Sequence, residues 1–116
     1  RLPEDAVCHW DLALVGTDAL RDSSSAAIAV CGLLELIKHL PVTDPDRECY
    51  QQWAMGIMSS LTRHYLVGKD EQGNGLLKPS VYHLSSNKGV DECASWGDYF
   101  YVEALMRFTQ SWKLYW

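Results

Sequence analysis

The segment from Ala26 to Leu40 constrains this chain most, because it is apolar on nearly every side when wound into a helix. Asp22 or Ser23 is placed to cap its start, and Pro41 ends it. A helix without a polar face is buried on all sides. A chain of 116 residues has little material with which to surround such a helix. We therefore expect this helix to need more neighbours than the chain itself supplies.

A second helix is predicted from the Thr43-Asp44-Pro45 sequence to about Tyr65. Asp44 is its expected N-cap, and Pro45 suits the first helical position because its fixed φ matches the helix. The apolar side chains of this segment recur at helical spacing on one side only. This pattern predicts an outer helix with one buried face.

A long polar segment and a third helix complete the chain. The segment from Val67 to Ala94 is rich in Gly, Asn, Ser and Lys, and we interpret it as a long loop in which Val81 to Leu84 favour a short strand. The third helix begins near Trp96 to Asp98, reaches about Ser111 and is again largely apolar. The predicted fold class is all-α, with three main helices plus a long loop. The order buried, one-sided, buried is typical of an α/α barrel.

Composition excludes several classes of function. The net charge is −5 and the basic residues form no cluster that could follow a phosphate backbone, so we expect no nucleic-acid partner. No apolar run approaches the roughly 20 residues that span a bilayer, so we expect no membrane partner. The four Cys are widely spaced without a Cys-x-x-Cys pair, which argues against zinc and thioredoxin-like sites, and we predict no metal site.

The expected topology places the candidate site at one end of the helices. Short connections make sequential helices antiparallel, so the first and third helices run parallel and both begin on the same face. Helix N-termini favour anions, and Arg21 and Lys88 add mobile positive charge nearby. The chain has five Trp and six Tyr against two Phe, an excess that suits ring-stacking clefts. The predicted substrate-binding residues on this face are Trp10, Asp11, Asp22, Ser85, Ser86, Lys88 and Trp96.

Each of these candidates also has a purely structural interpretation. Asp22 precedes a helical run, where an Asp normally accepts backbone N–H bonds as a cap. Asp98 has the same alternative for the third helix. Trp10 and Trp96 can equally be core residues, and Lys88 can be a solvated surface charge. No residue of the chain is predicted to be catalytic.

The chain resembles the unsaturated glucuronyl hydrolases, glycoside hydrolase family 88, which act on the products of polysaccharide lyases. The matching motifs are Trp10-Asp11, the run from Arg21 to Ala29, the run from Gly32 to Leu36, Trp96-Gly97-Asp98-Tyr99-Phe100 and Glu103-Ala104-Leu105. The resemblance implies a barrel of six α-hairpins, (α/α)6, of which residues 1–116 form the C-terminal portion. It thus implies that the chain is truncated at its N-terminus and packs against the rest of the parent barrel.

The family's chemistry follows from the same resemblance. Members protonate C4 and direct water to C5 of the unsaturated uronic acid at the non-reducing end of an oligosaccharide, which releases the neighbouring sugar without a cofactor. The two aspartates responsible are expected before Arg1, so the chain by itself is expected to be inactive. The resemblance aligns Ser85 to Lys88 with a loop that contacts the plus-one sugar, and members prefer Ser where this chain has His83. Relatives occur in the cytoplasm and in the periplasm.

A different class of function remains open from the residues alone. The chain is also compatible with a non-catalytic helical module that binds carbohydrate or serves as a scaffold. The sequence that precedes Arg1 distinguishes the two interpretations: a helical barrel sequence favours the enzyme, whereas an unrelated domain favours the module.

Overall fold

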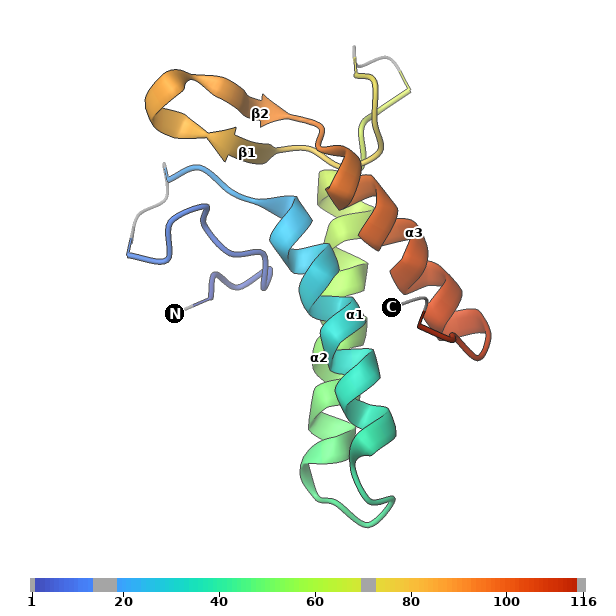
Figure 1. Ribbon diagram of the computed structural model, residues 1–116. Helices are drawn as coiled ribbons and strands as arrows, with labels where there is room; N and C mark the ends of the chain where they lie inside the picture. The colour runs from blue at the N-terminus through green and yellow to red at the C-terminus, as the bar shows by residue number, and fades with distance from the viewer. Residues whose placement is uncertain (1, 14–18, 70–72, 115–116) are drawn as a thin grey trace.

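The computed structural model describes residues 2–13, 19–69 and 73–114 and is mostly helical (Figure 1). An N-terminal arm precedes the helices, and a hairpin projects from one end of them (Figure 1). The elements are α1 (Ser23–His39), α2 (Asp46–Ser60), β1 (Ser80–His83), β2 (Lys88–Glu92) and α3 (Ser95–Thr109), with a π-helical turn (Leu61–Tyr65) after α2 and a 3₁₀ turn (Leu84–Ser86) between the strands.

Helix α1 is the centre of the fold, because it packs against both α2 and α3. A short turn reverses the chain between α1 and α2, whereas α3 runs in the same direction as α1 (Figure 1). The core consists of buried side chains of the three helices, the arm and the segment after α2, including Val7, Ala27, Val30, Ala54, Leu61, Leu77, Tyr101 and Ala104. The predicted parallel arrangement of the first and third helices is confirmed.

The predicted capping interactions at the starts of the first two helices are also confirmed. Asp22 is the N-cap of α1, and its carboxylate accepts the N–H of Ser24 at 3.1 Å. The carboxylate of Asp44 accepts the N–H of Asp46 at 2.9 Å, and Pro45 has helical dihedral angles of −64° and −25°. The assigned start of α2 is therefore one residue later than Pro45, a difference within the ordinary fraying of helix ends.

The prediction of an all-α chain with a long loop is wrong for residues 80–92, which form an antiparallel β-hairpin. Val81 pairs with Val90 and His83 with Lys88, and the register shifts between Ser80 and Val81. The predicted short strand at Val81 matches β1. Its partner β2 is polar and lacks alternating apolar residues, so no periodicity indicated it.

The apolar helices are less buried than their sequences predict. On α1, Ile28 and Leu36 are 42% and 41% exposed, although the helix was expected to be enclosed on all sides. The third helix was expected to be largely buried, yet Val102 is 46% exposed, and only Gly97, Tyr101, Glu103 and Ala104 of α3 are buried. The exposed apolar surface of α1 agrees with the expectation that this helix needs more neighbours than the chain supplies. Among the described residues, no helix is long and apolar enough to cross a membrane.

A buried ionic cluster joins α1 to α3, and the sequence analysis missed it. The side chain of Arg107 is 4% exposed and donates from Nε to Glu103 at 2.7 Å and from a terminal nitrogen to Glu35 at 2.6 Å. Hydrogen bonds from Lys38 and Arg107 lower the pKa of Glu35 to about 2. Burial alone would lower the pKa of Arg107, but its bonds to Glu35 and Glu103 outweigh burial and raise it. Glu35 and Arg107 therefore hold their charges across the physiological pH range.

Candidate functional site

The first turns of α1 and α3 meet at the end of the helices from which the hairpin projects (Figure 1). Gly97 makes this approach possible, since a Cβ atom on it would lie 3.0 Å from the Cβ of Ser24 and 3.4 Å from its Cα. Ser23 is completely buried at the same junction, where its N–H and its hydroxyl both donate to the carbonyl of Pro79. Three segments distant in sequence thus converge on one point.

A chain of hydrogen bonds fixes the indole ring of Trp96. Its Nε1–H donates to Oγ of Ser24 at 3.0 Å, and this hydroxyl donates to Asp22 at 2.6 Å. Asp22 therefore caps α1 and also accepts the hydrogen bond from Ser24 that orients the hydroxyl toward the indole. Trp96 is nevertheless 40% exposed, so part of its ring is open to solvent. A half-exposed ring held in one orientation is suited to stacking on a planar or apolar ligand face.

Trp96 lines a cavity of about 330 Å³ beside the hairpin. The ring of Tyr82, which the sequence analysis did not select, lies 5.9 Å from that of Trp96 with an interplanar angle of 54°. Gly89 has a φ of +56°, and its backbone passes close to Tyr82. The cavity is lined by Asn74, Ser80, Tyr82, Gly89, Cys93, Ala94, Ser95, Trp96 and Asp98. The site therefore combines two aromatic rings with hydroxyl, amide and carboxylate groups.

Asp98 stabilises the preceding loop and does not cap α3. Its carboxylate oxygen Oδ1 accepts the N–H groups of Leu76 and Leu77 at 2.9 and 3.0 Å. The N-cap of α3 is Ala94, which has no side chain able to cap. The cap interpretation of Asp98 is thus wrong. Both backbone donors are more than 20 residues away in sequence, so local spacing could not reveal them.

The predicted residues Ser85, Ser86 and Lys88 lie together at the tip of the hairpin. Nδ1 of His83 lies 2.7 Å from the hydroxyl of Ser86 and 3.3 Å from that of Ser85, and it accepts the N–H of Ser86. Lys88 is the strand partner of His83 and is exposed. Asn87 closes the tip in the left-handed conformation. Within the described part of the chain, these tip residues lie outside the lining of the Trp96 cavity.

Trp10 and Asp11 lie on the N-terminal arm. The backbone of Trp10 donates to Leu20 at 2.8 Å, and the carboxylate of Asp11 accepts the N–H of Ala13 at 2.9 Å, as in an Asx-turn. Of the predicted site residues, Asp22 and Trp96 are thus linked through Ser24, and Ser85, Ser86 and Lys88 lie together on the hairpin. Trp10 and Asp11 lie apart from both groups, on the arm. Arm and hairpin extend on the same side of the helices (Figure 1).

Arg21 is not the mobile cation that its sequence position indicated. It pairs with Asp5 at 3.1 Å and also donates to the carbonyl of Val7, which fixes the arm against the start of α1. The hydroxyl of Tyr65 donates to the same carboxylate at 2.6 Å. Burial and this bond to Asp5 raise the pKa of Tyr65 to about 12. Of the two cations proposed for the site, only Lys88 remains exposed.

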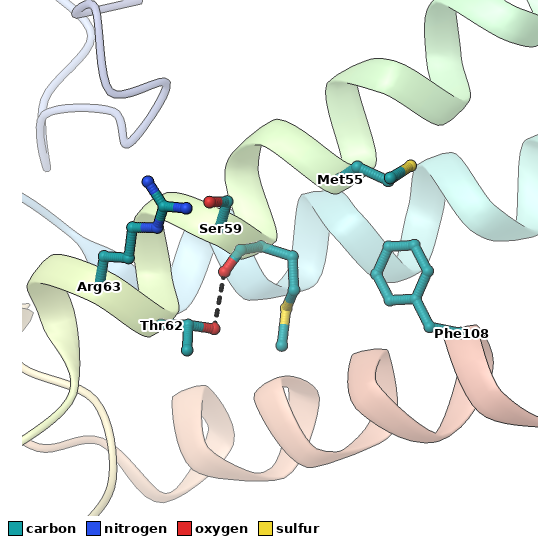
Figure 2. A pocket seen from close by; sticks show the side chains of 6 residues that line it. Met55, Ser59, Thr62, Arg63 and Phe108 are labelled. Carbon is teal, nitrogen blue, oxygen red and sulfur yellow. Dashed lines mark hydrogen bonds between the residues drawn. The ribbon is translucent and has the colours of Figure 1, made fainter.

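A second cavity of about 330 Å³ lies between α2 and α3 (Figure 2). Its lining is mainly apolar and contains none of the predicted site residues: Met55, Met58, Ser59, Thr62, Arg63 and Phe108. The hydroxyl of Thr62 donates to the carbonyl of Met58 (Figure 2) and also lies 3.1 Å from the hydroxyl of Tyr101. Among the described residues, no group of three or more His, Cys, Asp or Glu side chains is arranged to hold a metal ion.

Comparison with known proteins relates the chain to hydrolases. It is 48% identical over 117 residues to the unsaturated chondroitin disaccharide hydrolase of Streptococcus pneumoniae and 35% identical to the unsaturated glucuronyl hydrolase of Bacillus sp. strain GL1, covering 100% of this chain and 30% and 31% of theirs. A crystal structure of an unsaturated glucuronyl hydrolase mutant from Streptococcus agalactiae complexed with dGlcA-GalNAc6S matches with a TM-score of 0.92 and 47% identity, over 100% of this chain and 31% of that one.

The chain is thus a homologue of the unsaturated glucuronyl hydrolases, as the sequence motifs indicated. It spans about 30% of the length of the relatives that it matches. No protein-family model matches the chain.

Proposed function

We propose that this chain is part of a larger unsaturated glucuronyl hydrolase and forms the C-terminal portion of its (α/α)6 barrel. The observation that carries the proposal is sequence identity of 35–48% over the whole chain to hydrolases of this kind, with a matching fold. The exposed apolar surfaces of α1 and α3 support it, since an inner barrel helix has neighbours on every side.

The proposed reaction is hydration of the C4=C5 double bond of an unsaturated uronic acid. A proton is added to C4 and water to C5, after which the product opens and releases the neighbouring sugar. The substrates are lyase-generated, glycosaminoglycan-like oligosaccharides, in keeping with the disaccharide named in a relative's structure. The acid–base aspartates belong to the remainder of the enzyme, and we assign the reaction no metal or organic cofactor.

We assign this chain the binding side of the substrate cleft. Trp96, held by Ser24 and Asp22, offers a ring face to a sugar, and Tyr82 widens that surface. Ser85, Ser86 and Lys88 offer hydroxyl and ammonium groups for an anionic substituent at the hairpin tip. Trp10 and Asp11 on the arm complete the proposed binding set.

The activity is tested directly on the intact enzyme. Incubation with an unsaturated disaccharide from a glycosaminoglycan lyase is expected to remove the ultraviolet absorbance of the conjugated double bond, because hydration saturates C4 and C5. The 116-residue chain alone is expected to leave the absorbance unchanged, since it lacks the acid–base pair. Persistent absorbance with the intact enzyme rejects the proposed reaction, and turnover by the isolated chain rejects the assignment of catalysis to other segments.

Trp96→Ala in the intact enzyme is expected to raise KM about tenfold, because loss of a stacking surface costs on the order of 1.4 kcal/mol of binding. Trp53→Ala is the matched control: Trp53 is 48% exposed on α2, similar to the 40% of Trp96, and should leave KM unchanged. Trp96→Phe retains a ring without the N–H donor and separates stacking from the bond to Ser24. Equal KM values for the Trp96→Ala variant and the unmodified enzyme would remove Trp96 from the binding site.

A further inference from the structure

The carboxylate of Asp98 is held in one orientation at the wall of the Trp96 cavity. The N–H groups of Leu76 and Leu77 both bind its oxygen Oδ1, at 2.9 and 3.0 Å. In the part of the chain that the structure describes, the second oxygen, Oδ2, accepts no hydrogen bond. A carboxylate offers about four acceptor positions on its two oxygens. Asp98 therefore has unused acceptor capacity in a fixed place.

The loop before the hairpin passes beside Oδ2 at a glycine, which has no side chain to cover this oxygen. A Cβ atom added to Gly75 would lie 2.5 Å from Oδ2 and 2.6 Å from the Cβ of Cys93. Asp98 is half-buried and shares the lining of the cavity with Trp96 and Asn74. The carboxylate thus stands next to the aromatic ring that we assign to sugar stacking.

The charges around the cavity indicate which part of a substrate fits there. Among the described residues, its lining contains the carboxylate of Asp98 and no Lys, Arg or His side chain. A carboxylate without a cation repels an anionic group. It accepts a hydrogen bond from a hydroxyl about twice as strongly as a neutral acceptor does. The cavity is therefore suited to an uncharged sugar ring that carries hydroxyl groups.

We infer that Asp98 is a substrate-binding residue, whose oxygen Oδ2 accepts a hydrogen bond from a hydroxyl of an uncharged sugar stacked on Trp96. The inference rests on the proposed function, which places a sugar on Trp96. It assigns the cavity to the sugar ring next to the uronic acid, since the uronic acid itself is an anion. An anionic substituent on that ring is expected to point away from Asp98.

Asp98→Asn in the intact enzyme tests the role of Oδ2. The amide oxygen can still accept the N–H groups of Leu76 and Leu77, while an NH2 group takes the place of Oδ2. With an unsulfated unsaturated disaccharide, KM is expected to rise about tenfold, because a hydrogen bond to a charged group is lost. The value of kcat is expected to stay unchanged, since the lost contact is to a ring that does not react. The melting temperature should change little, because the loop contacts remain.

The direction of the change in KM distinguishes a hydrogen bond from a general effect of charge. The disaccharide is an anion, so the loss of a nearby negative charge by itself lowers KM. Glu92→Gln is the matched control, because Glu92 is an exposed carboxylate at the end of β2 and lies outside the cavity lining. A KM for Asp98→Asn equal to or below that for Glu92→Gln overturns the inference. A higher KM that appears only together with a loss of thermal stability also overturns it.

The double-bond assay on the unmodified enzyme separates this inference from the proposed function. If the unmodified enzyme hydrates the disaccharide and Asp98→Asn has the same KM, the role of Asp98 is rejected and the proposed function stands. If the unmodified enzyme leaves the double bond intact, the proposed function is rejected and the inference falls with it.

Discussion

Gly97→Val is expected to lower the unfolding free energy of the intact protein by about 3 kcal/mol, because overpacking a tight contact forces backbone shifts. The added Cβ would lie 3.0 Å from the Cβ of Ser24 and 3.4 Å from its Cα. The Ser24 backbone cannot retreat easily, since Asp22 and the buried Ser23 hold the first turn of α1. The measurement is the midpoint of urea unfolding together with soluble yield.

Gly56→Val provides the comparison for this substitution. Gly56 is a helical glycine of α2, and a Cβ added to it would meet nothing within 4 Å, so the same side chain enters open space. Its effect should stay within about 0.5 kcal/mol, since surface substitutions away from special features rarely exceed this. Similar losses at both positions would show that valine in a helix, rather than the α1–α3 contact, causes the effect.

Arg107→Met is expected to cost about 3–5 kcal/mol, because it leaves the buried carboxylate of Glu103 without its cation. The side chains of Arg107 and Glu103 are 4% and 2% exposed, so solvent cannot replace the lost partner. Methionine retains much of the volume, which separates the loss of charge from the loss of packing. Thermal unfolding of the intact enzyme measures the change.

Lys38→Met is the control for the Arg107→Met substitution. Lys38 donates to the same Glu35 at 2.8 Å but is 41% exposed, and exposed ion pairs contribute about 1 kcal/mol or less. A cost for Arg107→Met no larger than that for Lys38→Met would mean that the buried cluster contributes little to stability.

Helix positions could be predicted from the sequence because their signals are local. Asp22, Asp44 and Pro45 mark helix starts within a few residues, Pro41 marks the end of the first helix, and apolar periodicity identifies the second. The hairpin could not be predicted completely, since β2 is a polar strand that is defined by its pairing with β1. Burial was overestimated because periodicity identifies an apolar face and does not reveal whether a neighbour covers it.

The candidate site was predictable only in its position. The parallel helices indicated that Trp96 and the cap of α1 would lie together, and their hydrogen-bonded connection through Ser24 confirms that proximity. Tyr82, Glu103 and Arg107 were not predicted because their partners come from other segments of the chain or lie a helical turn away in a buried setting. The binding roles of the seven predicted residues stay predictions.

The hydrogen bonds at the hairpin tip affect which residues of this protein can change during evolution. Ser85 and Ser86 both bond to Nδ1 of His83, and the N–H of Asn87 donates to the carbonyl of Leu84, so residues of the turn itself hold it in place. Because the hairpin tip is held by its own hydrogen bonds, we expect that its residues can be replaced without a change in the packing of the helices. With the binding role proposed for Ser85, Ser86 and Lys88, ligand preference and folding stability would be set by separate parts of this chain.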